Sequence, residues 1–266
     1  MMKIILSLLI LLFSINSYAQ NTLKDVLDKI DWHSTESRLV YALKDNIEPT
    51  ERDVWEREET ESNYKFVGIS VAGYPIETSY VRVKQSTKEI FRLNFIVLND
   101  ESEISRYYAV KDDLVKQFGA PTFDLYEEKP DPVLNENKTI WLTDNYKVKA
   151  TQLDLSNVST KVLKYAYAVN VEPLVTYRVD VSRATVIQND YQREVPKFEY
   201  FRLDNDKNVY VKEIGFADYI LYKEKVIPSP KGDIISFDGG MVCYRPSEND
   251  IVYILNSFVV SYPVVK

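Results

Sequence analysis

The chain holds few of the residue types that perform nucleophilic or metal chemistry: one histidine, His33, and one cysteine, Cys243. A Ser-His-Asp or Cys-His relay would need His33 as its base, but the sequence has no Gly-x-Ser-x-Gly motif. We interpret His33 as a helix-junction or capping residue and Cys243 as a small buried hydrophobic residue. An ordinary zinc site needs several His or Cys ligands. We therefore predict no catalytic, cofactor-binding or metal residues.

One acidic stretch, residues 204–208, has the sequence Asp-Asn-Asp-Lys-Asn and opens like a calcium-binding loop. The signature then fails, because Val209 stands where the loop needs glycine and Gly215 where it needs glutamate. We interpret the stretch as a hairpin turn, with weak calcium binding as the alternative.

The carboxylates leave one enzymatic alternative open. The chain has 40 acidic residues, and glycoside hydrolysis needs only two of them at the right separation in space. Trp55, Trp141 and the tyrosines would supply stacking surfaces for sugars. A carboxylate-dependent glycan hydrolase is therefore kept as an alternative function.

Two arginines form the candidate binding site. Residues 79–85 and 89–99 alternate apolar and polar side chains, which predicts two half-buried strands joined by residues 86–88. With the loop at residues 86–88, matching the apolar faces places Val81 opposite Leu93, Val83 opposite Phe91, and Arg82 opposite Arg92. A loop shifted by one residue keeps the apolar match but pairs Arg82 with Asn94 instead, and the arginine pair then disappears.

Like charges on opposite strands are unfavourable unless a negative group lies between them. We expect either an acidic side chain of the protein or an exogenous anionic ligand beside Arg82 and Arg92. With the neighbouring Tyr80, they are the proposed binding residues.

A helix should follow this hairpin. Asp100 and Glu103 have capping-box spacing, while Gly119 and Pro121 end the segment. We expect the helix to pack on the hairpin, because neither can bury its apolar face alone. The residues expected on that face are Ile104, Tyr107, Tyr108, Leu114, Val115 and Phe118.

The remaining pattern predicts an α+β fold with two domains. Two short helices are expected first, within residues 21–30 and from Ser34 or Thr35 to Pro49. Beyond residues 172–173 the helical period disappears, and short strands separated by turn residues indicate an all-β sandwich-like or barrel-like domain. The predicted divisions are 1–19, a signal peptide; 20–172, an antiparallel sheet with a packed helix; and 173–266, mostly β.

The first residues are typical of a secretory signal peptide. Lys3 precedes an apolar run at residues 4–13, and the small residues at 17 and 19 indicate cleavage near Ala19. The run is shorter than the roughly 20 residues that a membrane-spanning helix needs. We expect a soluble protein in the periplasm or outside the cell.

The net charge excludes some classes of binding partner, and the cysteine count excludes an internal disulfide. The formal net charge is −7 and the sequence has no basic tract, which argues against nucleic acid and anionic membrane surfaces. A single cysteine permits no internal disulfide.

The order of elements resembles small uncharacterised exported α+β domains of Gram-negative bacteria, of the Bacteroidetes type. The resemblance rests on the helices around residues 31–35, a meander, the helix end Leu-Val-Lys-Gln-Phe-Gly-Ala-Pro, and the strands holding Trp141 and Tyr165. It covers about residues 21–171, and the signal end at residues 17–20 is similar too. It implies a fold and export but no activity.

We therefore expect an exported soluble binding or interaction protein without catalysis. Its partner would be an unknown protein or an envelope glycan. The alternatives are the glycan hydrolase and a structural or assembly component of the cell envelope.

Overall fold

The computed structural model describes residues 21–49, 59–76, 78–84, 86–97, 105–128, 135–154, 165–206, 208–216, 219–222, 225–227, 234–237 and 240–265. This part of the chain is mostly β, with antiparallel sheets and few helices. None of its helices is long and apolar enough to cross a membrane. The expected signal peptide, Trp55 and the expected cap at Asp100 lie outside these residues.

The chain divides into two compact units. The first comprises Met1–Leu142 and Val148–Val171, and the second Thr143–Lys147 and Glu172–Lys266. The main division thus falls next to the expected domain boundary at residues 172–173. Each unit is described by itself.

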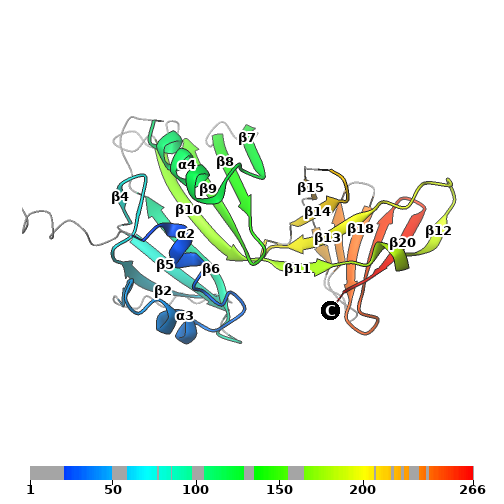
Figure 1. The fold of residues 1–266 in the computed structure, drawn as a ribbon, viewed down its shortest axis with the longest axis horizontal. Helices are drawn as coiled ribbons and strands as arrows, with labels where there is room; N and C mark the ends of the chain where they lie inside the picture. Colours follow the sequence, from blue (N-terminus) through cyan, green and yellow to red (C-terminus); the bar gives the residue numbers. More distant parts are fainter. Residues whose placement is uncertain are drawn as a thin grey trace, which may run out of the picture. The chain divides into compact units, whose positions relative to one another are not determined.

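The first unit is built on an eight-stranded sheet, of which the strand ends at residues 146–147 and 172–173 belong to the second unit (Figure 1). A separate two-stranded sheet consists of β3 (Ser70–Val71) and β4 (Tyr74–Pro75). The eight strands, in their order across the sheet, are β1 (Ile47–Pro49), β2 (Glu59–Phe66), β5 (Thr78–Lys84), β6 (Ile90–Val97), β10 (Tyr165–Pro173), β9 (Tyr146–Asp154), β8 (Asn135–Leu142) and β7 (Phe123–Glu128).

The β5–β6 hairpin follows the predicted alternation except at its closed end. Val81 is buried and lies opposite Leu93, as the sequence predicted. Val83 lies opposite Ile90, and the expectation that it would face Phe91 was wrong. A β-bulge shifts the register there, which exchanges the faces of neighbouring side chains, so Ile90 is buried and Phe91 only half-buried.

Two short helices precede the sheet strands. In α2 (Leu23–Leu27), Thr22 and Asp25 form a reciprocal capping box, as its spacing allowed. The second helix, α3 (Glu36–Ala42), ends earlier than expected. Ile47–Pro49 form β1 instead, because the residue before a proline favours an extended backbone.

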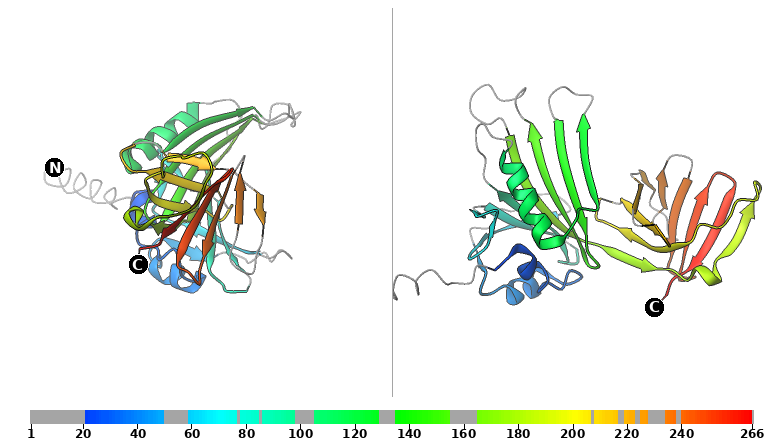
Figure 2. Two further views of the ribbon diagram at one scale, coloured as in Figure 1. Left: turned by 90° about the vertical axis from the view of Figure 1, so that its right-hand side faces the viewer. Right: turned by 45° about the horizontal axis from the view of Figure 1, so that its top comes forward.

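The long helix α4 (Ser105–Phe118) lies against the sheet (Figures 1 and 2). Its polar and aromatic contacts reach β8: the Tyr107 hydroxyl lies 2.7 Å from the Thr139 hydroxyl, and Phe118 packs near Trp141. These contacts correct the expectation that the helix packs on the β5–β6 hairpin. Tyr108 was also wrongly placed on the buried face, since it is exposed.

The second unit contains two antiparallel sheets, and its described residues form the β-rich part that the sequence predicted. One sheet has the order β11 (Val175–Arg178), β13 (Phe198–Leu203), β14 (Val209–Glu213) and β15 (Tyr219–Tyr222). The other has the order β12 (Thr185–Asn189), β20 (Phe258–Pro263), β19 (Asp250–Leu255), β18 (Gly240–Arg245), β17 (Ile234–Phe237) and β16 (Lys225–Ile227).

One hydrophobic core holds side chains from both of these sheets. A short 3₁₀ turn, η1 (Val181–Arg183), joins β11 to β12. The buried members of the core are Val179, Phe198, Phe201, Val209, Val211, Val242, Ile251, Tyr253, Phe258, Val260 and Tyr262.

Candidate functional site

The proposed binding residues lie on β5 and β6 in the register that a loop at residues 86–88 predicted. Arg82 lies directly opposite Arg92, and Tyr80 opposite Asn94. On the other side of β5, the backbone register places Glu61 of β2 opposite Arg82. Both arginines are half-buried and have interaction partners within the chain. An anionic ligand at this pair stays a prediction.

The histidine and the cysteine lie in different units. His33 is exposed after α2, and its backbone N–H donates to Asp31 Oδ1 at 3.3 Å. Cys243 on β18 is half-buried rather than fully buried, with Sγ 3.6 Å from the Tyr244 carbonyl oxygen.

A group that the sequence reasoning missed lies in the second unit. The Lys147 ammonium forms ion pairs with Glu172 Oε1 and Asp204 Oδ2. We call these three residues the Lys147 cluster. Their side chains are 2%, 2% and 0% exposed, respectively. Buried charges are costly unless paired and hydrogen-bonded, and in this cluster the lysine is paired with both carboxylates.

Backbone pairing brings the two strand residues of the cluster together. Lys147 stands near the start of β9 and Glu172 near the end of β10, and these strands are neighbours in the sheet order. The Leu174 N–H donates to the Asn145 carbonyl at 2.9 Å, which aligns the two segments beside the cluster.

The third member, Asp204, comes from the β13–β14 turn. The antiparallel pairing of Leu203 with Val209 confirms the hairpin interpretation of this stretch, of which Lys207 lies outside the described residues. Asn208 donates from its backbone N–H to Oδ1 at 2.9 Å and from its side-chain amide to Oδ2 at 2.8 Å. The Tyr210 hydroxyl donates to Oδ2 at 2.9 Å. An aspartate that accepts bonds from its own turn is a common turn-forming arrangement.

The surroundings shift two protonation equilibria. Burial by itself lowers the pKa of Lys147, but the attraction of Glu172 and Asp204 outweighs it and raises the pKa overall. Burial and then the adjacent Asp204 carboxylate raise the pKa of Tyr210. At neutral pH Lys147 is therefore an ammonium and Tyr210 a protonated phenol.

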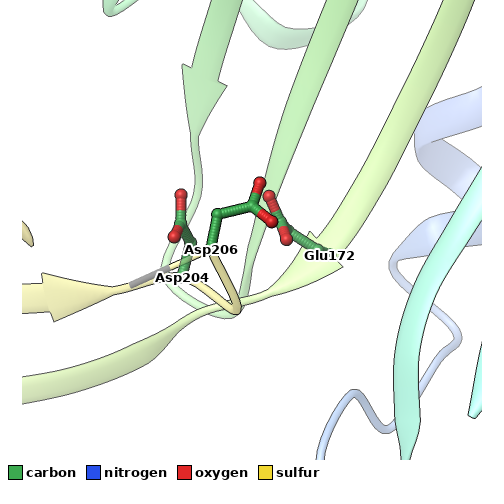
Figure 3. A group of neighbouring side chains, drawn as sticks. All are labelled: Glu172, Asp204 and Asp206. Atoms are coloured by element: carbon green, nitrogen blue, oxygen red, sulfur yellow. The ribbon is translucent and has the colours of Figure 1, made fainter. Parts of the chain in front are cut away.

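The same carboxylates are the group best suited to a metal ion among the described residues. Glu172, Asp204 and Asp206 each offer an oxygen within 4.8 Å of the others. Glu172 comes from the end of β10, and the two aspartates come from the β13–β14 turn (Figure 3). The Lys147 ammonium already supplies the positive charge that a cation would bring.

The arrangement also bears on the hydrolase alternative. A glycosidase needs two carboxyl groups that reach the substrate. Glu172 and Asp204 are buried and both bind Lys147, and only Asp206 of the three acids is exposed. This group is therefore not arranged to act on a glycan.

One sequence signal pointed weakly to the cluster. Lys147 and Glu172 each stand between apolar residues of a strand segment, but a charged residue between apolar neighbours usually faces solvent.

Comparison of the chain with protein-family models, with curated proteins and with solved structures finds no match in any of the three.

Proposed function

We propose that the protein is exported and acts by binding another protein, without catalysing a reaction. The observation that carries the proposal is the outer edge of β12 in the second unit, which pairs with no further strand in the part of the chain that the structure describes. In the sheet order β12 is the terminal strand and pairs with β20. Residues 185–188 are all exposed, with Val186 at 42% and Ile187 at 57%.

An edge strand presents unpaired backbone N–H and C=O groups on which a further strand can form. Proteins usually protect such edges with charges, proline or a bulge. Residues 185–189 carry no charge and no proline. The strand does have a register shift at Ile187, but that bulge leaves an apolar side chain exposed, and the exposed Tyr191 follows two residues after the strand.

The occupant we propose is an extended, apolar segment of a different protein. Backbone hydrogen bonds would supply affinity, and contacts with Val186 and Ile187 would supply selectivity. A second copy of the chain is less suitable, because each copy carries a formal charge of −7 and like charges oppose association. Export is supported by the signal-like residues 1–19. A two-layer sandwich for the second unit and an α+β domain for the first belong to the same proposal.

A random linear peptide library selected on the purified full chain tests this proposal. We expect selected peptides to be rich in β-branched and aromatic residues and to slow hydrogen exchange in β12. Their affinity for an Ile187→Lys variant should fall at least about tenfold, which corresponds to ~1.4 kcal/mol. Tyr41→Lys on α3 is the matched control, since Tyr41 is also exposed and apolar.

Two results would contradict the proposal. The first is selected peptides that bind both variants equally and protect a segment other than β12. The second is release of reducing sugars from envelope glycans by the purified protein, which would restore the hydrolase alternative.

A further inference from the structure

The Lys147 cluster brings an amine and two carboxyl groups into contact inside one unit. The Lys147 nitrogen contacts both Glu172 and Asp204, and all three residues belong to the second unit. With side chains at most 2% exposed, the groups are shielded from water. Contact of this kind replaces a bimolecular encounter by one within the fold, which strongly favours reaction between the groups.

We propose that Lys147 and Asp204 condense to a side-chain amide bond, with Glu172 as the proton carrier. The bond would be a covalent cross-link between the start of β9 and the β13–β14 turn. This inference is independent of the proposed function of β12.

The step balances without any further reactant. An Nζ proton passes to Glu172, and the freed amine attacks Cγ of Asp204, so that an Nζ–Cγ bond forms. Glu172 hands the proton to Oδ2, and a second Nζ proton follows by the same route. The Cγ–Oδ2 bond then breaks and Oδ2 leaves as water. An ammonium and a carboxylate thus become an amide and one water molecule, with no change in oxidation state.

The hydrogen-bond donors around Asp204 identify it as the acceptor of the attack. In the tetrahedral intermediate, negative charge collects on the carboxyl oxygens, where fixed donors stabilise it. Asn208 N–H lies 2.9 Å from Oδ1, the oxygen that stays in the amide. The Tyr210 hydroxyl and the Asn208 side chain lie 2.9 and 2.8 Å from Oδ2, the oxygen that leaves.

The role of Glu172 follows from the protonation state of the amine. The two carboxylates hold Lys147 in the ammonium form by raising its pKa against the opposing effect of burial. An ammonium has no lone pair and does not attack. A second carboxylate in contact with the same nitrogen supplies the base that removes its proton.

Intact mass spectrometry of the purified, denatured full chain tests the proposal. We expect a mass below that of the sequence by one water molecule. After trypsin digestion, fragmentation should place the loss on a branched peptide that joins Lys147 to Asp204, without cleavage after Lys147. Lys147→Arg and Glu172→Gln should show the full mass, whereas Lys149→Arg, a matched change on the same strand, should keep the loss.

The full sequence mass in the wild type, with normal cleavage after Lys147, would overturn the proposal and leave an ion cluster only. A water loss located elsewhere in the chain would overturn it too. The wild-type mass and digest show whether the cross-link forms even if a variant fails to fold. A linked Glu172→Gln protein would refute the proton-carrier role alone.

Discussion

Two lysine–aspartate pairs, one in each unit, share most of their chemistry but differ in their access to water. In the first unit, Lys111 pairs with Asp124, and the side chains are 20% and 50% exposed. In the second unit, Lys147 and Asp204 are 2% and 0% exposed. Each pair has a buried tyrosine nearby, but Tyr210 donates directly to Asp204.

The first-unit tyrosine acts through an intermediary. The Tyr107 hydroxyl contacts the Thr139 hydroxyl at 2.7 Å, and Thr139 donates to Asp124 Oδ1 at 2.9 Å. Water screens the exposed pair, and such pairs contribute little. Water does not reach the buried lysine and its two carboxylates, so removal of the lysine leaves two buried negative charges without a cation.

The largest contrast should come from removing each lysine. Lys147→Met leaves two buried carboxylates without their cation and should lower the free energy of unfolding by about 3–5 kcal/mol. Lys111→Met should cost at most about 1 kcal/mol. Urea unfolding followed by circular dichroism measures both, and equal losses would show that burial does not separate the two pairs.

Removing the tyrosine hydroxyl beside each pair should give a smaller difference in the free energy of unfolding. Both phenols are protonated near neutral pH, since burial raises the pKa of Tyr107 to about 12 and raises that of Tyr210 as well. In a Lys147→Arg background, where Asp204 cannot form the proposed amide and stays a carboxylate, Tyr210→Phe removes a donor to a charged group and should cost about 1.5–3 kcal/mol, against about 0.5–1.5 kcal/mol for Tyr107→Phe, whose partner is neutral. Urea midpoints compare the two, and a larger loss for Tyr107→Phe would contradict the comparison.

The smallest effect concerns the exposed pair in acid. Burial raises the pKa of Asp124, but hydrogen bonds from Lys111 and Thr139 outweigh it and hold the pKa below the ordinary 3.8. The stabilisation is therefore complete above the unfolded-state value and is lost as the pH falls through the folded-state value. After solvent screening it should be less than about 1 kcal/mol.

Asp124→Asn tests this directly. The variant should lose stability less steeply than the wild type as the pH falls below about 4, and the two proteins should differ least at the lowest pH. The free energy of unfolding of both proteins can be measured in urea at a series of acidic pH values. If the two plots against pH stayed parallel, protonation of Asp124 would not account for the loss of stability.

Local sequence patterns predicted local structure well. The helix α2, which Thr22 caps, lies within residues 21–30, where the apolar spacing predicted a short helix. The alternation of β5 and β6, together with a loop at residues 86–88, predicted Arg82 opposite Arg92, since strand side chains have a period of two. Alternation alone equally allowed Arg82 opposite Asn94. The bulge that buries Ile90 was missed, because it inserts a residue without changing the average alternation.

Contacts between distant segments were not predictable in the same way. The contact of α4 with β8 joins residues more than 20 positions apart, and the choice of sheet strands under a helix depends on the whole sheet order. The burial of Lys147 could not be predicted from the sequence, because a lysine in an alternating strand ordinarily faces water. Only the β13–β14 turn, which places Asp204 against it, shows otherwise.

The sequence by itself determined the β-rich character, the short capped helix α2, the turn at residues 204–208 and the absence of an internal disulfide, because each depends on neighbouring residues or on composition. The tertiary structure alone decided which charges are buried and that β12 is a terminal strand of its sheet. Burial depends on segments that the chain brings together from far apart, and Lys147 and Asp204, 57 positions apart in sequence, are the clearest example.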